Sequence, residues 1–258
     1  MTLPLVFITG ASSGIGQALA TRFHAAGYRL ALVARRVAEV QSWAQSQGFE
    51  ASRFAVYAAD VRDIAAITGA GHACMAAQGL PDVVIASAGI SVGIDTAVFD
   101  DLEVMRSVFE TNNLGTAATF QPFVAAMCKR GSGALVGIAS VAAIRGLPGH
   151  GAYCASKAAV VAYCESLRGE LRPSGVKVVT IVPGYIDTPL TRKNPYGMPF
   201  LMPADAFAHR AFEAISAGAS YRVIPWQMGV VAKLLRLLPN PLFDKLLAGR
   251  ARKPRRST

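Results

Sequence analysis

Tyr153 and Lys157 lie four residues apart in a stretch of good helix formers, and Ser140 stands thirteen positions before the tyrosine. Positions i and i+4 of a helix share a face, so the ammonium group of Lys157 is expected beside the phenol of Tyr153. Such a positive charge would lower the pKa of the phenol, which suits a group that exchanges a proton near neutral pH. The three side chains could converge on one carbonyl oxygen. Alone, a Tyr-x-x-x-Lys pair is also consistent with an ordinary exposed helix face.

A glycine-rich turn follows the first apolar run of the chain and leads into a helical pattern at 17–23. The turn reads Thr9-Gly10-Ala11-Ser12-Ser13-Gly14-Ile15-Gly16. Glycines let a backbone turn tightly and approach a diphosphate, while the free N–H groups of the helix start attract the anion. The spacing differs from the usual dinucleotide fingerprint G-x-G-x-x-G. A tight strand-to-helix corner without a ligand is the alternative interpretation.

These motifs and several others, in the same order, resemble the single-domain form of the short-chain dehydrogenase/reductase family. The matching positions are Thr9 to Gly16, Asp60-Val61, Asn112-Asn113-Leu114-Gly115, Ser140, Tyr153 with Lys157, Pro183-Gly184 and Thr188. One segment departs from the family, because Ala86-Ser87-Ala88-Gly89 stands where Asn-Asn-Ala-Gly is frequent. The Ala-Gly half keeps the close backbone approach, but the hydrogen bonding of the first Asn is put in doubt.

The resemblance implies an oxidoreductase that passes hydride between a nicotinamide and a carbonyl or alcohol carbon. Tyr153 would donate the proton, Ser140 would hold the substrate oxygen, and Lys157 would bind the nicotinamide ribose. Asn112, which heads the Asn-x-x-Gly pattern as Asn113 does not, would hold a water that links the lysine to solvent. The implied cofactor contacts are Gly10, Ser12, Ser13, Gly14, Ile15, Gly16, Arg35, Arg36, Asp60, Val61, Ala88, Gly89, Tyr153, Lys157, Pro183, Gly184, Ile186 and Thr188.

The end of the second apolar run indicates which cofactor is preferred. An enzyme that uses NAD usually places a carboxylate there to bind the ribose hydroxyls. This chain has Ala34, followed by Arg35 and Arg36, whose forked donors suit a 2′-phosphate. We therefore expect NADP, with NADPH favoured over NADH. A solvated basic pair at a strand end is the alternative.

Length and composition predict one α/β domain over residues 1–258. The chain is 52% hydrophobic, enough for one well-buried core, and it has no linker or repeat. Apolar runs at Leu5–Thr9, Leu30–Val33, Phe54–Ala58, Val83–Ala86, Ala134–Ala139 and Val176–Val182 alternate with helical patterns. This alternation predicts a Rossmann-like, doubly wound parallel sheet with helices on both faces. Ligands should bind beyond the carboxyl ends of its strands.

The four cysteines and the amino-terminal residues bear on location. Neither C-x-x-C spacing nor a cluster with His is found among the four, Cys74, Cys128, Cys154 and Cys164. We therefore expect no metal site, and we expect reduced thiols in a cytoplasmic protein. The chain enters its first strand after Pro4 without a leader-like segment. No uncharged apolar stretch reaches the roughly 18 residues that suggest a membrane span.

A substrate lid is expected at about residues 185–204, where the family varies. The segment is apolar and contains proline and methionine, which suits a bulky hydrophobic substrate. A lid that only packs on its own enzyme is the alternative.

A basic, leucine-rich segment at about residues 227–258 closes the chain. From Arg222 onward there are nine basic residues and one acid, so most of the net charge of +10 lies here. Such a segment could associate peripherally with an anionic membrane, or its leucines could pack on the domain or between subunits and leave a solvated tail. A homodimer or homotetramer is expected. Nucleic acid is not, because no aromatic platform or known module accompanies the tail.

The functional expectation is an NADPH-dependent carbonyl reductase or alcohol dehydrogenase for a hydrophobic, lipid-like ketone or secondary alcohol. A 3-oxoacyl thioester reductase with an acidic acyl carrier as its partner is the alternative enzyme. An NADP-binding regulator or scaffold without turnover is the alternative of another class.

Overall fold

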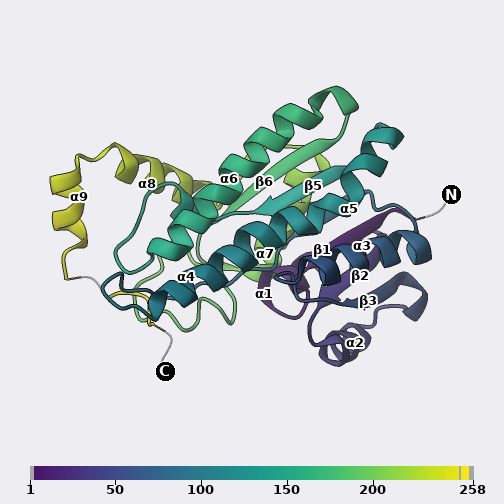
Figure 1. Ribbon diagram of the computed structural model, residues 1–258, viewed down its shortest axis with the longest axis horizontal. Coiled ribbons are helices and arrows are strands. Elements are labelled where there is room, and N and C mark those ends of the chain that lie inside the picture. Colours follow the sequence, from purple (N-terminus) through teal and green to yellow (C-terminus); the bar gives the residue numbers. More distant parts are fainter. Residues whose placement is uncertain (1–2, 250, 256–258) are drawn as a thin grey trace.

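A seven-stranded, fully parallel sheet forms the centre of the protein (Figure 1). The computed structural model describes residues 3–249 and 251–255. In spatial order, the strands are β3 (Phe54–Ala58), β2 (Arg29–Ala34), β1 (Leu5–Thr9), β4 (Val83–Ala86), β5 (Ala134–Ile138), β6 (Lys177–Pro183) and β9 (Tyr221–Ile224). The six apolar runs therefore form strands, as predicted. The sequence did not predict β9, because this edge strand has only four residues and begins with two exposed ones.

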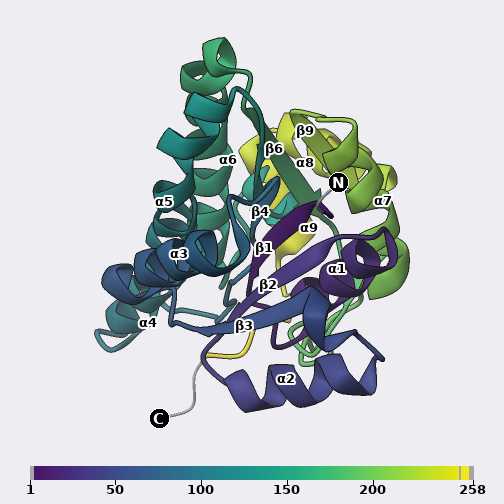
Figure 2. The ribbon, with the colours of Figure 1, turned by 90° about the vertical axis from the view of Figure 1, so that its right-hand side faces the viewer.

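Helices cover both faces of the sheet, which confirms the predicted fold class (Figure 2). One face carries α1 (Gly14–Ala25), α2 (Val37–Ser46) and α7 (Ala204–Ser216), whose apolar side chains join one core cluster. The other face carries α3 (Ile64–Gln78), α5 (Gly115–Arg130) and α6 (Gly151–Leu171), which join a second cluster. The short helix α4 (Asp101–Phe109) packs against α6.

Burial of apolar side chains holds these layers together. Phe23 of α1 and Phe207 of α7 are fully buried on one face, and Phe7 of β1 meets Phe123 of α5 on the other with ring centres 4.9 Å apart. Each such side chain stabilises the fold by about 1.5–3 kcal/mol. The strand order reverses between β1 and β4, so the crevice for a ligand opens at their carboxyl ends.

The C-terminal elements lie beyond the edge of the sheet. The lid residues include a two-stranded pair, β7 (Ile186–Asp187) with β8 (Met202–Pro203). After β9, the helices α8 (Trp226–Leu237) and α9 (Asn240–Leu247) project from the body at the left of Figure 1. Short 3-10 turns occur at Ala51–Arg53, Val141–Ala143 and Arg172–Ser174.

Arg145 fixes the turn between α8 and α9. Its guanidinium donates to the carbonyl oxygens of Leu235 and Leu238 at the end of α8 and lies 3.7 Å from the ring centre of Phe243 in α9. A cation is favoured at the C-terminal end of a helix dipole and over an aromatic face. The arginine therefore stabilises the junction electrostatically.

The tail packs in part on the domain, whereas one expectation from the sequence was a solvated tail; four of its five described residues are exposed, and Lys253 is buried. Residues 251–255 return to the loop that follows β4, where the N–H of Gly93 donates to the carbonyl of Pro254 over 3.0 Å. Lys253 is buried, and the guanidinium of Arg255 donates two hydrogen bonds to Asp101, at 2.7 and 3.1 Å. Two of the tail cations are thus engaged within the protein. Arg250 and Arg256, which the same expectation included, lie outside the described residues.

Candidate active site

Ser140, Tyr153 and Lys157 meet at the carboxyl end of β5, as their spacing predicted. Ser140 follows β5 and begins a short turn, where its hydroxyl accepts from the N–H of Ala142 over 3.2 Å and also bonds the phenol of Tyr153. Tyr153 lies in the first turn of α6, with the Nζ of Lys157 5.9 Å from its ring centre. That Nζ donates to the carbonyl of Ile138 over 2.8 Å. One wall thus carries a hydroxyl, a phenol and an amine.

The expected lowering of the Tyr153 pKa is wrong. Burial raises the pKa of this phenol, and the hydrogen bond from Ser140 offsets that rise only in part. Burial also lowers the pKa of Lys157 to about 8, so the lysine itself resists carrying its charge there. The physical reason is that burial of both groups disfavours their charged forms by more than the lysine charge would favour a phenolate. A phenol with a raised pKa keeps its proton at neutral pH and can donate it.

Asn112 lies in a π-turn, Glu110–Leu114, that separates α4 from α5. This side chain is fully buried, and its amide accepts from the N–H of Ile90 at 2.9 Å and donates to the carbonyl of Ile90 at 3.0 Å. Its Nδ2 also donates to the hydroxyl of Ser156, which donates to the backbone carbonyl of Tyr153. Asn112 therefore ties the loop after β4 to the helix that holds the tyrosine. Asn113 instead donates to the backbone carbonyl of Ser156.

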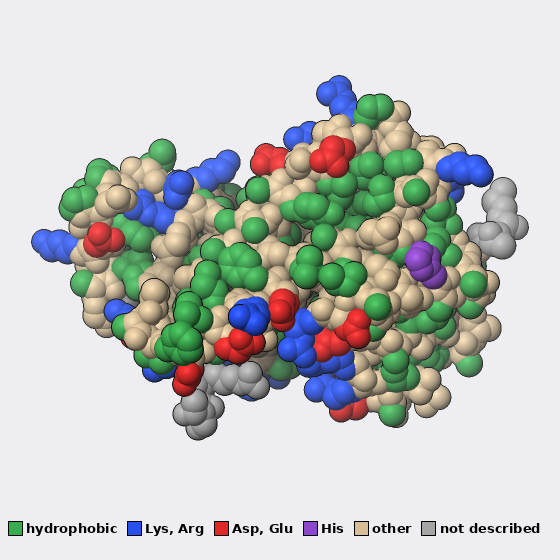
Figure 3. Space-filling model, viewed as in Figure 1, with side chains coloured by type: hydrophobic (Ala, Val, Ile, Leu, Met, Phe, Trp, Pro, Cys, Tyr) green, Lys and Arg blue, Asp and Glu red, His purple; other side chains and the backbone are tan. Residues whose placement is uncertain are grey.

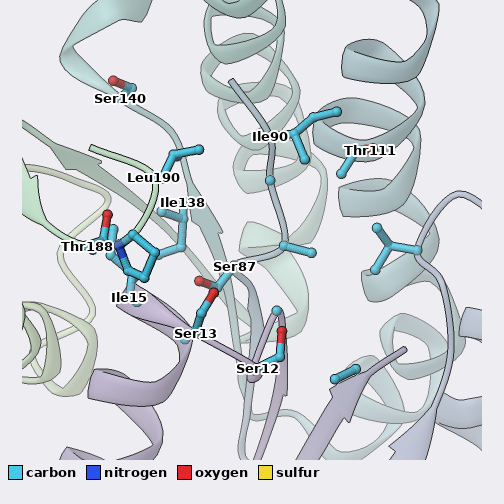
Figure 4. Close-up of a pocket in the computed structure, with 18 of the residues that line it drawn as sticks. Ser12, Ser13, Ile15, Ser87, Ile90, Thr111, Ile138, Ser140, Thr188 and Leu190 are labelled. Atoms are coloured by element: carbon cyan, nitrogen blue, oxygen red, sulfur yellow. The ribbon is translucent and has the colours of Figure 1, made fainter. Parts of the chain in front are cut away.

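A hollow of about 640 Å³ runs from the glycine-rich turn to Tyr153. Every residue expected to contact the cofactor lines it, as do Ser140, Tyr153 and Lys157, whereas Asn112 lies behind its wall. Figure 4 shows Ser12 and Ser13 at one side of it, with Thr188 and Ser140 further along. The residues named from the sequence thus share one hollow, together with others that it did not name, such as Val104 and Thr111.

Two glycines of the turn are required by close approach. A Cβ at Gly16 would lie 2.2 Å from the carbonyl oxygen of Gly10, and Gly10 itself has a φ of 71° with its Cβ position 2.8 Å from Ala88. Any larger residue would push the turn away from the sheet. The turn ends at Ser13, where α1 begins with no acidic residue in its first turn. The N–H groups at the start of this helix can donate hydrogen bonds to an anion.

The opposite end of the hollow is basic. Arg35 and Arg36 follow β2 and are exposed, and Arg35 lies 3.5 Å from the carboxylate of Asp60. Arg62 binds the same carboxylate by hydrogen bonds at 2.8 and 3.2 Å, and these bonds are the main cause that lowers the pKa of Asp60. Arg36 pairs with Glu39 at 2.7 Å. Asp60 is thus held by Arg62, which leaves Arg35 the more weakly bound cation.

Thr188 is held by a residue that the sequence analysis missed. The hydroxyl of Thr191 accepts from the N–H of Thr188 over 3.0 Å and donates to the carbonyl of Ile186. The two hydroxyl groups are 3.2 Å apart. A Thr-x-x-Thr pair after a strand is typical of a side-chain-capped turn and could have been noticed. The turn orients Thr188 toward the hollow that it lines.

Thr9 links the ends of β1 and β4, where the family pattern is broken at Ala86 and Ser87. The Thr9 hydroxyl donates to the carbonyl of Ile85 at 3.4 Å and accepts from the N–H groups of Ser87 and Ala88, at 3.2 and 3.4 Å. The hydroxyl of Ser87 has no hydrogen-bond partner among the described residues. The threonine therefore adds side-chain hydrogen bonds to the backbone pairing of β1 with β4.

Comparison with known proteins agrees with this geometry. A family model described as short chain dehydrogenase matches residues 4–197. A protein of Myxococcus xanthus described as an uncharacterized oxidoreductase is 37% identical over 247 residues, which cover 95% of this chain and 96% of that protein. The chain belongs to the short-chain dehydrogenase family. It is accordingly an oxidoreductase of that family, whose members bind a nicotinamide cofactor and small-molecule substrates.

Two further proteins resemble this short-chain dehydrogenase over most of their length. The bovine dehydrogenase/reductase SDR family member 7B is 33% identical over 273 residues, 98% of this chain and 83% of that protein. The alcohol dehydrogenase of Thermococcus sibiricus, solved in complex with 5-hydroxy-NADP, superposes with a TM-score of 0.75 at 26% identity, over 86% of this chain and 96% of that one. The described residues include no helix that combines the length and apolar character needed to cross a bilayer.

Proposed function

We propose that this short-chain dehydrogenase is an NADPH-dependent reductase of hydrophobic ketones. The observation that carries the proposal is the arrangement of one hollow, with Ser140, Tyr153 and Lys157 at one end and Arg35 at the other. The reaction would convert a ketone, NADPH and a proton into a secondary alcohol and NADP⁺. Bound NADPH would supply the hydride to the carbonyl carbon.

The residues of the chain would supply the proton and hold the oxygen. Ser140 would donate a hydrogen bond to the carbonyl oxygen, and Tyr153 would transfer its proton there as negative charge develops. The raised pKa of Tyr153 supports this direction, because the phenol is protonated before the reaction. Lys157, held by Ile138 and with a pKa of about 8, can pass a proton toward the phenol. Asn112 would position the loop and helix around them.

The hollow fits NADP on two grounds. First, the glycine turn folds so tightly on itself that a side chain at Gly16 would collide with Gly10, and its glycines leave the backbone N–H groups at the start of α1 open to a diphosphate. Second, β2 ends at Ala34 without a carboxylate, and Arg35 can turn toward a 2′-phosphate. The first ground applies to either cofactor, whereas the second favours NADPH over NADH.

A hydrophobic substrate is supported by the lid and by a second hollow of about 440 Å³ beside it. Aromatic and aliphatic side chains dominate its walls, which include Leu147, Tyr185, Tyr196 and Leu247. Tyr185 and Tyr196 both lie near enough to Tyr153 to interact electrostatically with its phenol. An apolar chain in this hollow would therefore reach the catalytic tyrosine.

The test is a panel of ketones with NADPH or NADH, in which loss of absorbance of the reduced cofactor is followed. Medium-chain methyl ketones should be reduced with a higher kcat/KM than acetone, and with NADPH rather than NADH. A 3-oxoacyl thioester in the same panel tests the alternative enzyme. If no carbonyl compound oxidises either cofactor although NADPH binds, a scaffold without turnover becomes the better account.

Helices α8 and α9 support peripheral membrane association as a further property of this enzyme. One stripe of α8 exposes Trp226, Val230, Leu234 and Leu237, from 47% to 80% of each side chain, and α9 exposes Leu242 and Leu246. Lys233, Arg236 and Lys245 are exposed beside them, and Figure 3 shows basic and hydrophobic side chains together on this lobe. Apolar insertion and attraction to anionic lipid would act together. Lys253 and Arg255 would add little to this attraction, because both are engaged within the protein.

Sedimentation with anionic vesicles at low salt tests the membrane property. The wild type should pellet with the vesicles, Leu234→Asp should remain in the supernatant, and Leu102→Asp, an exposed leucine on α4, should behave like the wild type. A different result is expected if the stripe joins subunits of a homodimer or homotetramer. In that case the wild type would not pellet, and Leu234→Asp would lower the molar mass measured by light scattering.

A further inference from the structure

Lys253 is a buried cation without a carboxylate partner among the described residues. Its side chain is only 9% exposed, and its Nζ donates to the amide oxygen of Asn194 in the lid over 2.6 Å. No ion pair joins it to an acid within the described ranges, whereas its neighbour Arg255 pairs with Asp101. Burial and the nearby Lys193 both lower the pKa of Lys253. A buried charge is costly unless an anion compensates it.

The fold holds this lysine firmly in its place. The carbonyl oxygen of Lys253 lies 2.1 Å from the position that a Cβ would take at Gly93, so the tail packs directly on the backbone of the loop after β4. On the next residues, the carbonyl of Pro254 accepts from Gly93 and Arg255 binds Asp101. Figure 1 shows the tail in yellow beside this loop. These contacts anchor the backbone at Lys253 and the two residues after it, so the tail does not need the charge of Lys253 to stay in place.

Lys253 itself lines neither hollow, but residues close to it line both. Ile90 and Val92, just before Gly93, line the large one, and Ala251 lines the second. His150, three residues before Tyr153, also lines the second hollow. Burial lowers the pKa of this imidazole, and the nearby charge of Lys253 lowers it further. The Nε2 of His150 has no hydrogen-bond partner among the described residues. A cation and a free imidazole nitrogen thus lie near one apolar hollow.

We propose that the ketone substrate carries an anionic group, a carboxylate or a phosphate monoester, which Lys253 and His150 bind while its apolar chain fills the second hollow. This inference rests on the proposed reductase function and narrows its substrate class. The anion would displace the amide oxygen of Asn194 as the partner of Nζ and would accept a hydrogen bond from the imidazole. Tyr185 and Tyr196 would enclose the chain, so that the carbonyl group reaches Tyr153.

Binding of unreactive amphiphiles tests the inference without any turnover. Dodecanoate, dodecyl phosphate and dodecanol are titrated by calorimetry into the full-length protein that holds NADP⁺. A charge-assisted contact should make at least one anion bind about ten- to a hundredfold more tightly than the alcohol. Dodecyl phosphate as the tighter ligand would identify a phosphate monoester, and dodecanoate a carboxylate. Equal affinity of all three compounds for the wild type would overturn the proposal, whatever the variants do.

Matched variants assign the effect to the lysine. Lys253→Met removes the charge and keeps most of the apolar stem, so it should abolish the preference for the anion and leave dodecanol binding within about twofold of the wild type. Lys129→Met, which removes an exposed charge from α5, should retain the full preference. A Lys253→Met protein with an unchanged preference would contradict the assignment.

Kinetics separate this inference from the function on which it rests. NADPH oxidation is followed with 9-oxodecanoate and with its methyl ester. Lys253→Met should raise KM for the acid about ten- to a hundredfold with little change in kcat, and should leave the ester unaffected. Reduction of both compounds with equal KM by the wild type would overturn the anion site and leave the reductase intact. Anion-selective binding without reduction of any ketone would instead contradict the reductase.

Discussion

The cofactor hollow and the C-terminal region differ in what their charged and polar residues do. Around the hollow, the residues that matter sit at the ends of buried parallel strands, where backbone geometry leaves few choices, as Gly10 and Gly16 illustrate. In the C-terminal region, the charged residues make contacts across long sequence separations, such as Arg255 with Asp101 and Lys253 with Asn194. Local patterns therefore predict the first region well and the second poorly.

The difference also separates general chemistry from specificity. Hydride and proton transfer need a fixed arrangement of a few groups, which the sheet and α6 provide. We expect substrate choice to depend on the lid, α9 and the tail, which contribute residues to the walls of the second hollow. Changes at the hollow should therefore affect all substrates, and changes in the tail only some.

Among the substitutions in the cofactor hollow, Lys157→Met should reduce activity most severely. Turnover should fall by about 10²–10⁴-fold, as is typical for loss of a group in proton transfer, and the affinity for NADPH should fall with it. The free energy of unfolding at pH 7 should rise by up to about 3 kcal/mol, because the lysine is buried with its pKa lowered from 10.5 to about 8. Steady-state kinetics and chemical denaturation measure the two effects.

The pH dependence of this gain has a definite sign. Between pH 8 and 10.5 the unfolded chain binds the proton of Lys157 and the folded protein does not, so the stability of the wild type rises with pH in that window. The stability advantage of Lys157→Met should be full below pH 8 and vanish toward pH 10.5. The exposed Lys129→Met serves as the control. An advantage that does not change with pH would show that the lysine is not buried as a costly cation.

Arg35→Asp should alter cofactor choice by a smaller factor. The carboxylate would repel a 2′-phosphate and accept hydrogen bonds from ribose hydroxyls, so the ratio of kcat/KM for NADPH to that for NADH should fall about ten- to a hundredfold. Arg210→Asp makes the same charge change on an exposed position of α7 and should leave the ratio unaltered. If the wild type uses both cofactors equally well, the cofactor assignment fails.

Asp101→Asn should have the smallest effect of these substitutions, and the effect should be limited to how firmly the tail is held. The hydrogen bonds from Arg255 lower the pKa of this carboxyl, so the pair persists at neutral pH and is lost only as the pH falls through that lowered pKa. Without the charge, trypsin should cleave after Arg252 several-fold faster, as followed by mass spectrometry. The neighbouring Asp100→Asn is the control. Equal cleavage of all three proteins would mean that the backbone contacts at Gly93 alone hold the tail.

The sequence predicted the sheet and the walls of the hollow because strand ends and glycine turns are local features. It did not predict β9, a short and half-exposed edge strand. It also gave the wrong direction for the pKa of Tyr153, because helix spacing shows the nearby lysine but not the burial of both groups. The contact of Lys253 with Asn194 spans 59 positions, and nothing in the basic tail distinguishes this lysine from its exposed neighbours.

Transfer of an isotopic label tests the central claim most directly. The wild type and Tyr153→Phe are each incubated with a medium-chain methyl ketone and NADPH that carries deuterium at both C4 positions of the nicotinamide. We expect the wild type to make an alcohol with one deuterium on its carbinol carbon. Tyr153→Phe should still bind NADPH but form that alcohol about 10²–10⁴-fold more slowly. Unlabelled alcohol from the wild type, or a near-normal rate from the variant, would contradict the central claim.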